Sequence, residues 1–189
     1  ENLAREILEL HTLGVNGGYT QNDVTEFARI LTGWAHGGIR NRRSIRFLGP
    51  IHGNFEFRYR AHEPGPKTLL GERYPENGEQ EGIKALKYLA RHPATARFIA
   101  TKLARHFIAN DPPGDAIAAL ARGFRDSDGN LSAVSRELIG LDKVWSTPLP
   151  KIKTPYELIV STLRAVDFQN FPERRLAGSL RQLGHFPFR

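Results

Sequence analysis

The joint between residues 11 and 24 constrains the fold most, because it ends one amphipathic helix and starts another. In residues 2–13, a period of about 100° per residue gathers one apolar face, made of Leu3, Ala4, Ile7, Leu10 and His11. Gly14 follows the helix end, where glycine accommodates a left-handed backbone. Thr20 stands three residues before Asp23, the spacing of a helix-starting capping box. The pattern predicts two helices and a turn that needs no ligand.

Helical periodicity returns after residue 78 and continues to the end of the chain. Proline, glycine and aspartate residues break this part into separate segments and supply helix starts. The predicted helices lie at residues 81–92, 93–108, 116–126, 131–140, 156–168 and 173–184. We therefore predict a mainly α protein, built as a multi-helix orthogonal bundle.

Residues 43–60 change to a period of two, which is typical of β-strands. Ile45 and Phe47 alternate with polar residues, and after the loop "GPIHGN" the segment "FEFRYR" alternates aromatic and charged residues. We predict one small antiparallel β-hairpin at about residues 43–60. Its aromatic side chains are expected to face the core, which leaves its arginines facing outward.

The chain of 189 residues is long enough for one domain. We predict a single helical domain over residues 1–189, with a weak candidate boundary in the proline-rich connector 146–155, since the two helices after it bury little surface on their own. The chain starts inside a helical pattern and contains no methionine, which favours a piece of a longer protein. No apolar run approaches the roughly 18 residues of a transmembrane helix. The oligomeric state stays open.

Positive charge is concentrated in one part of the sequence. The net charge is +7, and residues 36–73 hold eight basic against three acidic residues. Our first hypothesis is a non-catalytic binding or assembly module for an anionic polymer or an acidic protein. Its anion-binding residues would be Arg46, Arg58, Arg60 and Lys67. Nucleic-acid binding is a second alternative that rests on net charge alone, because the expected aromatic face points away from solvent.

A hydrolase-like enzyme is the other class that the sequence leaves open. Its candidate catalytic residues come from separate blocks: His11, Asp23, His62, Glu63 and Lys67. His11 lies in an apolar stripe, so we expect a core histidine, and Asp23 serves the helix cap. His62 and Glu63 are neighbours in extended chain and should point to opposite sides. The chain contains no cysteine and no recognised catalytic motif, so we predict no metal site and no cofactor.

Several stretches resemble a bacterial family catalogued as domain of unknown function 1800. They are "ENLAREILELHTLGVNGGYTQNDVTEFARILTGW", "FEFRYRAHEPGPKTLLG", "HPATARFIATKLARHFI" and "KIKTPYELIVSTLRAV". The positions that match its motifs are His11, Gly14, Gly17, Gly18, Tyr19, Thr20, Asp23, Trp34, His62, Lys67, Gly71, His92, Pro93, Thr95 and Lys102. The family pattern has His-Asp where this chain has His62-Glu63. The resemblance implies no activity, but it implies an exported or periplasmic, envelope-associated location, with the cytoplasm as the alternative.

Overall fold

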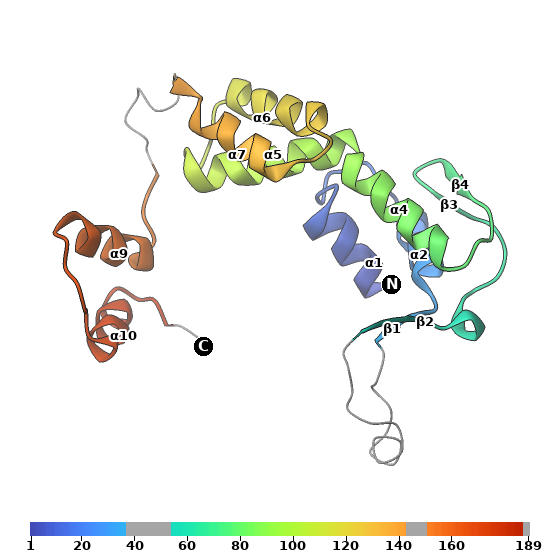
Figure 1. Cartoon of the computed structure of the whole chain (residues 1–189), viewed down its shortest axis with the longest axis horizontal. Coiled ribbons are helices and arrows are strands. Elements are labelled where there is room, and N and C mark those ends of the chain that lie inside the picture. The colour runs from blue at the N-terminus through green and yellow to red at the C-terminus, as the bar shows by residue number, and fades with distance from the viewer. Residues whose placement is uncertain (37–53, 143–150, 187–189) are drawn as a thin grey trace, which may run out of the picture.

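The computed structural model describes residues 1–36, 54–142 and 151–186, and this part is mainly helical (Figure 1). In these ranges it has eight α-helices and two antiparallel sheets of two strands each. The first half contains α1 (Asn2–Glu6), the π-helical turn η1 (Ile7–His11), α2 (Gln21–Leu31), β1 (Trp34–His36), β2 (Phe55–Phe57), the 3-10 turn η2 (Tyr59–Ala61), β3 (Lys67–Leu69) and β4 (Glu72–Tyr74). The second half contains α4 (Glu79–Arg91), α5 (Pro93–Phe107), α6 (Gly114–Asp126), α7 (Leu131–Ile139), α9 (Pro155–Ala165) and α10 (Glu173–Gln182). The predicted class, mainly α with a small hairpin, is confirmed.

The helix ends that local sequence predicts are present in the structure. The Thr20 hydroxyl accepts from Asp23 N at 3.2 Å, and the Asp23 carboxylate accepts from Thr20 N at 2.7 Å, which completes the capping box. Gly14 has φ +81° and donates its backbone N–H to the carbonyl of Leu8 at 3.0 Å. A Cβ atom at Gly14 would lie 2.6 Å from the Phe98 ring, so conformation and space both demand glycine here.

The apolar face predicted for the first helix is wrong at Leu3, which is 60% exposed, and throughout its second half. Leu10 is 51% exposed and His11 is exposed too, whereas Ala4 and Leu8 are buried. The cause is η1, because a π-helical turn closes i→i+5 bonds and has more residues per turn than an α-helix. The register of the face therefore shifts after residue 6. His11 is not the core histidine that we expected.

The first sheet keeps only part of the predicted hairpin. β2 pairs with β1, so that Trp34 lies opposite Phe57. The proposed first strand near residues 43–48 lies outside the described residues. β2 ends after three residues and the chain turns into η2, which interrupts the period of two. The expected inward aromatic row is consequently wrong: Phe55 is 52% exposed and Tyr59 is 71% exposed.

A second sheet, β3–β4, was not predicted from the sequence. Its connecting residues, Leu70 and Gly71, both have positive φ, at +51° and +81°, as a tight type I′ hairpin turn requires. Two carboxylates of helix α2 accept hydrogen bonds from backbone N–H groups of this hairpin. The carboxylate of Asp23 accepts from Leu70 N at 2.7 Å, and that of Glu26 accepts from Thr68 N at 2.9 Å. Asp23 thus caps its own helix and anchors a sheet.

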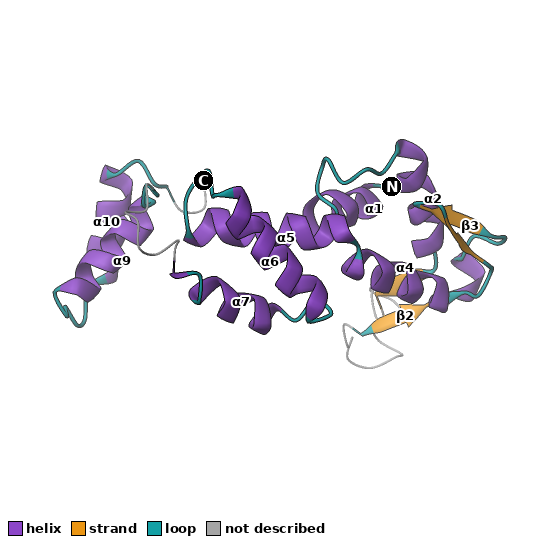
Figure 2. Cartoon of the chain, turned by 90° about the horizontal axis from the view of Figure 1, so that it is seen from above, coloured by secondary structure: helices purple, strands orange, loops and turns teal. Residues whose placement is uncertain are grey.

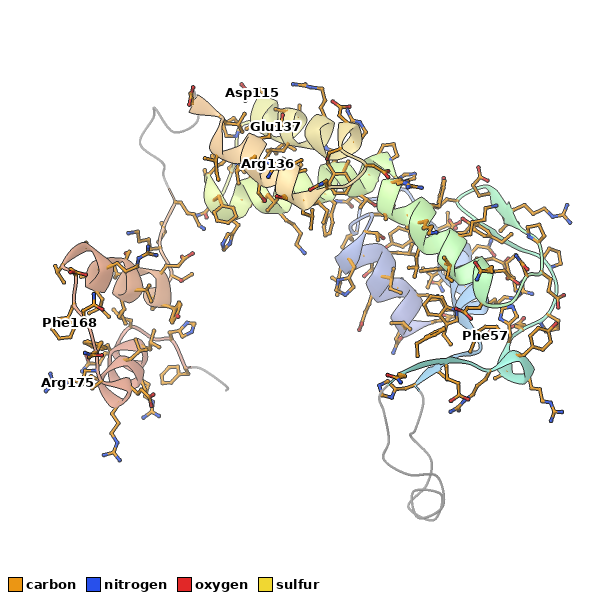
Figure 3. All side chains as sticks on the ribbon, in the orientation of Figure 1. Phe57, Asp115, Arg136, Glu137, Phe168 and Arg175 are labelled. Atoms are coloured by element: carbon orange, nitrogen blue, oxygen red, sulfur yellow. The ribbon has the colours of Figure 1, made fainter. Side chains whose placement is uncertain are left out.

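The buried apolar residues form two clusters along the chain. The first lies between α1, α2, the β3–β4 hairpin and α4, and the second lies between α5, α6 and α7 (Figure 2). Helices α9 and α10 contact each other, and a pocket beside α9 is also lined by His106 and Phe107 at the end of α5. Figure 3 draws the side chains of α9 and α10, with Phe168 and Arg175 labelled. The boundary at 146–155, partly outside the described residues, stays a prediction. None of the described helices combines the length and apolar character needed to cross a bilayer.

The Gly14 turn can be tested against a matched glycine in the same loop. Gly18 also has a positive φ, +86°, but a Cβ there would meet nothing within 4 Å. We expect Gly18→Ala to lower the free energy of unfolding by about 1 kcal/mol through backbone strain alone. Gly14→Ala should cost about 2–4 kcal/mol, because the new methyl group also displaces the Phe98 ring. Urea unfolding of both variants measures the difference, and equal losses would contradict this account.

Candidate functional site

Three ionisable side chains meet in the first core, and two of them belong to the sequence-predicted set. His62 follows η2, Lys67 opens β3 and Glu81 lies in the first turn of α4. His62 Nε2 lies 3.1 Å from Glu81 Oε1, and Lys67 Nζ lies 2.9 Å from Glu81 Oε2. The side chains are only 3%, 0% and 1% exposed for His62, Lys67 and Glu81. We call this group the buried cluster.

Further contacts fix the proton positions in the buried cluster. His62 Nδ1 lies 2.8 Å from the Thr32 carbonyl, which can only accept, so Nδ1 carries a hydrogen. His62 Nε2 also lies 3.1 Å from Lys67 Nζ. Nε2 therefore lies between Lys67 Nζ and Glu81 Oε1, at 3.1 Å from each. Lys67 also donates to the Glu63 carbonyl at 2.6 Å.

The carboxylate at the centre of the buried cluster is held in its charged form. Burial alone would raise the pKa of Glu81, but hydrogen bonds from the Asn77 backbone N–H, from Lys67 and from His62 lower it overall. Its Oε1 atom accepts from Asn77 N at 2.7 Å and from Gly78 N at 3.1 Å. The ionised Glu81 therefore both starts α4 and compensates the charge of the buried lysine.

The surroundings of the buried cluster settle two expectations about it. His62 and Glu63 do point to opposite sides: Glu63 is exposed and its carboxylate lies 2.7 Å from Arg29 Nε. Lys67 is not an exposed anion-binding residue, because strand β3 turns it inward onto Glu81. Glu81 was missed from the sequence, where its only signal is its place three residues after Gly78, which resembles a helix-capping acid.

The remaining predicted residues do not join the buried cluster. His11 is exposed at the end of η1, and Asp23 is engaged by the cap and by Leu70. Arg46 lies outside the described residues. Arg58 lies 3.4 Å from the Glu56 carboxylate, and Arg60 is exposed in η2. Within the described ranges, no three His, Cys, Asp or Glu side chains are grouped so that they could hold a metal ion.

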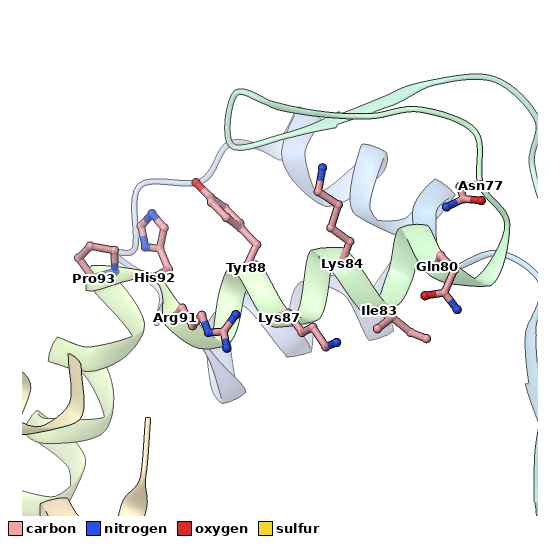
Figure 4. Close-up of a pocket in the computed structure, with 9 residues that line it drawn as sticks. All are labelled: Asn77, Gln80, Ile83, Lys84, Lys87, Tyr88, Arg91, His92 and Pro93. Atoms are coloured by element: carbon pink, nitrogen blue, oxygen red, sulfur yellow. The ribbon is translucent and has the colours of Figure 1, made fainter. Parts of the chain in front are cut away.

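A second feature, which the sequence did not single out, runs along the exposed face of α4. It is an open groove of about 770 Å³, which we call the basic groove (Figure 4). Its lining residues are Asn77, Gln80, Ile83, Lys84, Lys87, Tyr88, Arg91, His92 and Pro93. Three of them are cations and none is acidic. Figure 4 looks onto this face, with Lys84 and Tyr88 on one side of the helix and Lys87 and Ile83 on the other.

The cations of the basic groove lie at positions i, i+3 and i+7 of one helix, so they are close neighbours along it, with Lys84 and Lys87 on its two flanks (Figure 4). Arg91 is paired with Asp128 through contacts of 2.7 and 2.8 Å. Lys84 Nζ lies 5.1 Å from the centre of the Tyr74 ring. Neither Lys84 nor Lys87 has a carboxylate within ion-pair distance in the part of the chain that the structure describes. The groove therefore presents two uncompensated positive charges.

The opposite face of α4 explains why these lysines are held outward. Ala85 and Leu89 are fully buried in the first core. Gly82 allows a close approach, since a Cβ atom there would lie 2.5 Å from the Trp34 ring. With that face packed and Glu81 fixed inside, the rotation of α4 about its axis is set. Lys84 and Lys87 are then placed in solvent by the helical period alone.

His92 closes the C-terminal end of the basic groove and starts the next helix. Its Nδ1 atom accepts from Ala94 N at 3.2 Å, so the neutral ring carries its hydrogen on Nε2. The Tyr88 ring packs edge-on at 5.7 Å. Burial lowers the pKa of His92 below its usual value. The neutral form is the one that caps α5.

The described part of the molecule is thus a mainly helical protein with a buried histidine–lysine–glutamate cluster and a basic groove beside it. The chain belongs to the family described as protein of unknown function (DUF1800), whose family model matches residues 1–189. The resemblance noted in the sequence is confirmed over the whole chain. Comparisons with curated proteins and with solved structures gave no match.

Removing the charge of Glu81, at the centre of the buried cluster, should reduce the free energy of unfolding far more than removing the charge of the nearby Glu79. Glu81→Gln leaves Lys67 buried without its counter-ion, and we expect a loss of about 3–5 kcal/mol in the free energy of unfolding. Glu79→Gln, also in the first turn of α4, should cost about 0.5 kcal/mol. Because the folded state lowers the Glu81 pKa, its stabilisation is present above the ordinary value of 4.5 and is lost as the pH falls through the lowered value. Urea midpoints at neutral and acid pH test both statements.

The cap formed by His92 should make the free energy of unfolding depend on pH. Asparagine at position 92 should remove this dependence. Above the ordinary pKa of 6.5 the ring is neutral in both states and its stabilisation is complete. Below that value the unfolded chain takes up the proton first, so stability falls until the pH passes the lowered pKa of the folded state. His92→Asn keeps a cap-competent side chain and should lose less stability between about pH 7.5 and about pH 5. The exposed His11→Asn is the control, and an identical profile for both variants would contradict the assignment.

Proposed function

We propose that this protein is a binding module that engages an anionic partner through the basic groove of α4. One observation carries the proposal: Lys84, Lys87 and Arg91 line a single groove of about 770 Å³ that contains no acidic residue. Concentrated charge of one sign in a concave surface raises the local concentration of oppositely charged ligands. The same general function was expected from the sequence, but at a different place.

The geometry favours the basic groove over the arginines of the first hairpin. An exposed cation that already has a carboxylate partner must give up that contact to bind another anion. Each surface has one paired arginine, Arg58 with Glu56 in the hairpin and Arg91 with Asp128 in the groove. Among the described residues no ion pair is recorded for Lys84 and Lys87 in the groove or for Arg60 in the hairpin, so the groove offers two unpaired cations and the hairpin one. Nine residues line the groove, so a ligand in it would contact more than one side chain at a time.

The buried cluster supports a structural role better than a hydrolytic one. A general base needs a free nitrogen within reach of the substrate proton. Both ring nitrogens of His62 already have partners inside the protein, and the side chain is 3% exposed. The same contacts join β3 to α4 and to the end of α2. We therefore assign the buried cluster to holding the basic groove in place.

Single-stranded nucleic acid is a second candidate partner, because the structure exposes aromatic side chains that we expected to be buried. Phe55 is 52% exposed and Tyr59 is 71% exposed, and Tyr59 stands between the exposed Arg58 and Arg60 in the sequence. Exposed aromatic rings among basic residues are the elements that stack on unpaired bases. The first hairpin is therefore the surface with which the groove should be compared in a binding experiment.

Two double variants with equal charge loss distinguish these surfaces. Lys84→Gln/Lys87→Gln should weaken the binding of labelled polyglutamate roughly tenfold at low salt, because two contacts between lysine and carboxylate are lost. For the same reason, the affinity should fall less steeply as the salt concentration rises. Arg58→Gln/Arg60→Gln removes the same charge elsewhere and should have little effect. Fluorescence anisotropy against salt concentration measures both. If the two variants weaken binding equally, only net charge matters and the groove has no special role; if the arginine pair alone matters for an oligonucleotide, the second candidate is favoured.

A further inference from the structure

We infer that the pocket between the end of α5 and α9 binds a free amphiphile, which has one anionic head group and one aliphatic tail. The pocket shares no lining residue with the basic groove, so this site is separate from the proposed function and can be tested without it. Its volume of about 770 Å³ lies within the roughly 300–1,000 Å³ that is typical of pockets for small ligands. We call it the α5–α9 pocket, and six of its residues define its chemistry: Phe107, Lys153, Tyr156, Val160, Ser161 and Arg164.

Two cations gather on the wall that α9 and the residues before it contribute. Arg164 lies three residues after Ser161, so their side chains are neighbours on one side of the helix. Lys153 Nζ donates to the Ser161 hydroxyl at 2.8 Å, which places its charge about one helical turn from Arg164. Both cations are exposed, and neither has a carboxylate within ion-pair distance among the described residues. An anionic head group that lies between them is attracted by two positive charges at once.

The carboxylate among the lining residues, Glu157, is already compensated. Its Oε1 atom lies 3.6 Å from Lys151 Nζ, and its Oε2 atom accepts from Thr154 N at 2.9 Å. Hydrogen bonds from Thr154, together with the charge of Lys151, hold the pKa of the Glu157 carboxyl below its ordinary value. Glu157 therefore stays ionised and paired with Lys151, and the charges of Lys153 and Arg164 are left for a ligand.

An apolar wall with exposed side chains adjoins the two cations. Tyr156 and Val160 are four residues apart on α9, as are Val160 and Arg164, so the apolar side chains lead directly to the cations. Phe107 contributes from the end of α5. Tyr156 is 52% exposed and Phe107 is 49% exposed, and α9 buries none of its residues. A ligand that covers these side chains removes apolar surface from water, which favours binding.

The apolar wall favours an aliphatic tail over a ring with a polar edge. Phe107 and Val160 have no hydrogen-bonding side-chain atom, and Tyr156 has a single hydroxyl. A nucleobase or a sugar would give up its hydrogen bonds with water here and find few replacements, which weakens binding. An alkyl chain has no such bonds to lose. The ligand that matches the pocket is therefore a carboxylate or phosphate head joined to an aliphatic tail.

The same arrangement favours a free amphiphile over a lipid that stays in a bilayer. A lipid in a bilayer presents its head group and keeps its tail among other lipids. It would neutralise Lys153 and Arg164 but leave Tyr156 and Phe107 in water. A free amphiphile satisfies both parts of the pocket, because its tail is available to the apolar wall.

Three probes test the two parts of the pocket by titration calorimetry on the full chain at neutral pH. Decanoate has both head and tail, decanol lacks the charge and acetate lacks the tail. We expect decanoate, below its micelle concentration, to bind roughly tenfold more tightly than either other probe. Lys153→Gln/Arg164→Gln should weaken decanoate binding roughly tenfold and leave decanol binding unchanged. Tyr156→Gln should weaken the binding of both decanoate and decanol, because it removes part of the apolar wall.

The control variants remove the same kinds of group outside the pocket. Arg174→Gln/Arg175→Gln removes two charges from exposed positions of α10, and Phe168→Gln removes an exposed ring. Neither should change decanoate binding, and neither should Lys84→Gln/Lys87→Gln in the basic groove. Loss of decanoate binding in that last variant would place the ligand in the basic groove and overturn this inference.

Four further results would overturn the α5–α9 pocket as an amphiphile site. They are no saturable binding of decanoate, equal affinities for decanoate and decanol, equal losses in the pocket and α10 charge variants, and equal losses in Tyr156→Gln and Phe168→Gln. Vesicles of phosphatidylglycerol and phosphatidylcholine test the other source of an anionic head group. If the protein sediments with these vesicles through Lys153 and Arg164 but does not bind decanoate, the site recognises a bilayer and the free amphiphile is excluded. The basic groove is unaffected by any of these results, because its test uses polyglutamate.

Discussion

The ionised carboxylate of Glu81 is the interaction on which this half of the molecule depends. It compensates a fully buried lysine, contacts a histidine that is held by the end of α2, and accepts two backbone N–H groups at the start of its own helix. A buried charge is tolerated only when such partners surround it. Since those partners come from α2, β3 and α4, the cluster fixes the three elements in one arrangement. The outward face of α4, and with it the basic groove, follows from that arrangement.

Sequence reasoning succeeded where a structure is decided by residues close together in the chain. The Thr20–Asp23 capping box and the left-handed Gly14 were predicted because each depends on contacts within a few positions. The shift at η1 was not predictable in this way. A helical wheel assumes about 100° per residue, and a single π-helical turn moves every later residue to another side. Leu10 and His11 are exposed for that reason.

Charge and periodicity in the sequence were less informative about side chains whose exposure is decided by tertiary contacts. Eight basic residues between 36 and 73 indicated an anion-binding surface, yet Lys67 of this group is buried against Glu81. A count of charges does not show which of them have partners. The family resemblance pointed to His62 and Lys67, but Glu81, the third member of the cluster, had only the appearance of a helix cap. The two free lysines of α4 lay outside the basic segment altogether.

The basic groove is a place where a local rule of stability is broken. Like charges at i, i+3 and i+7 on one helix repel each other, and Lys84, Lys87 and Arg91 have this spacing. Only Arg91 has a carboxylate partner, in Asp128, so the repulsion between the lysines reduces stability slightly in the free protein. A negatively charged ligand would relieve it, and sites where sequence departs from local consistency are where function is expected. This departure is the reason why we propose α4, and not the first hairpin, as the binding surface.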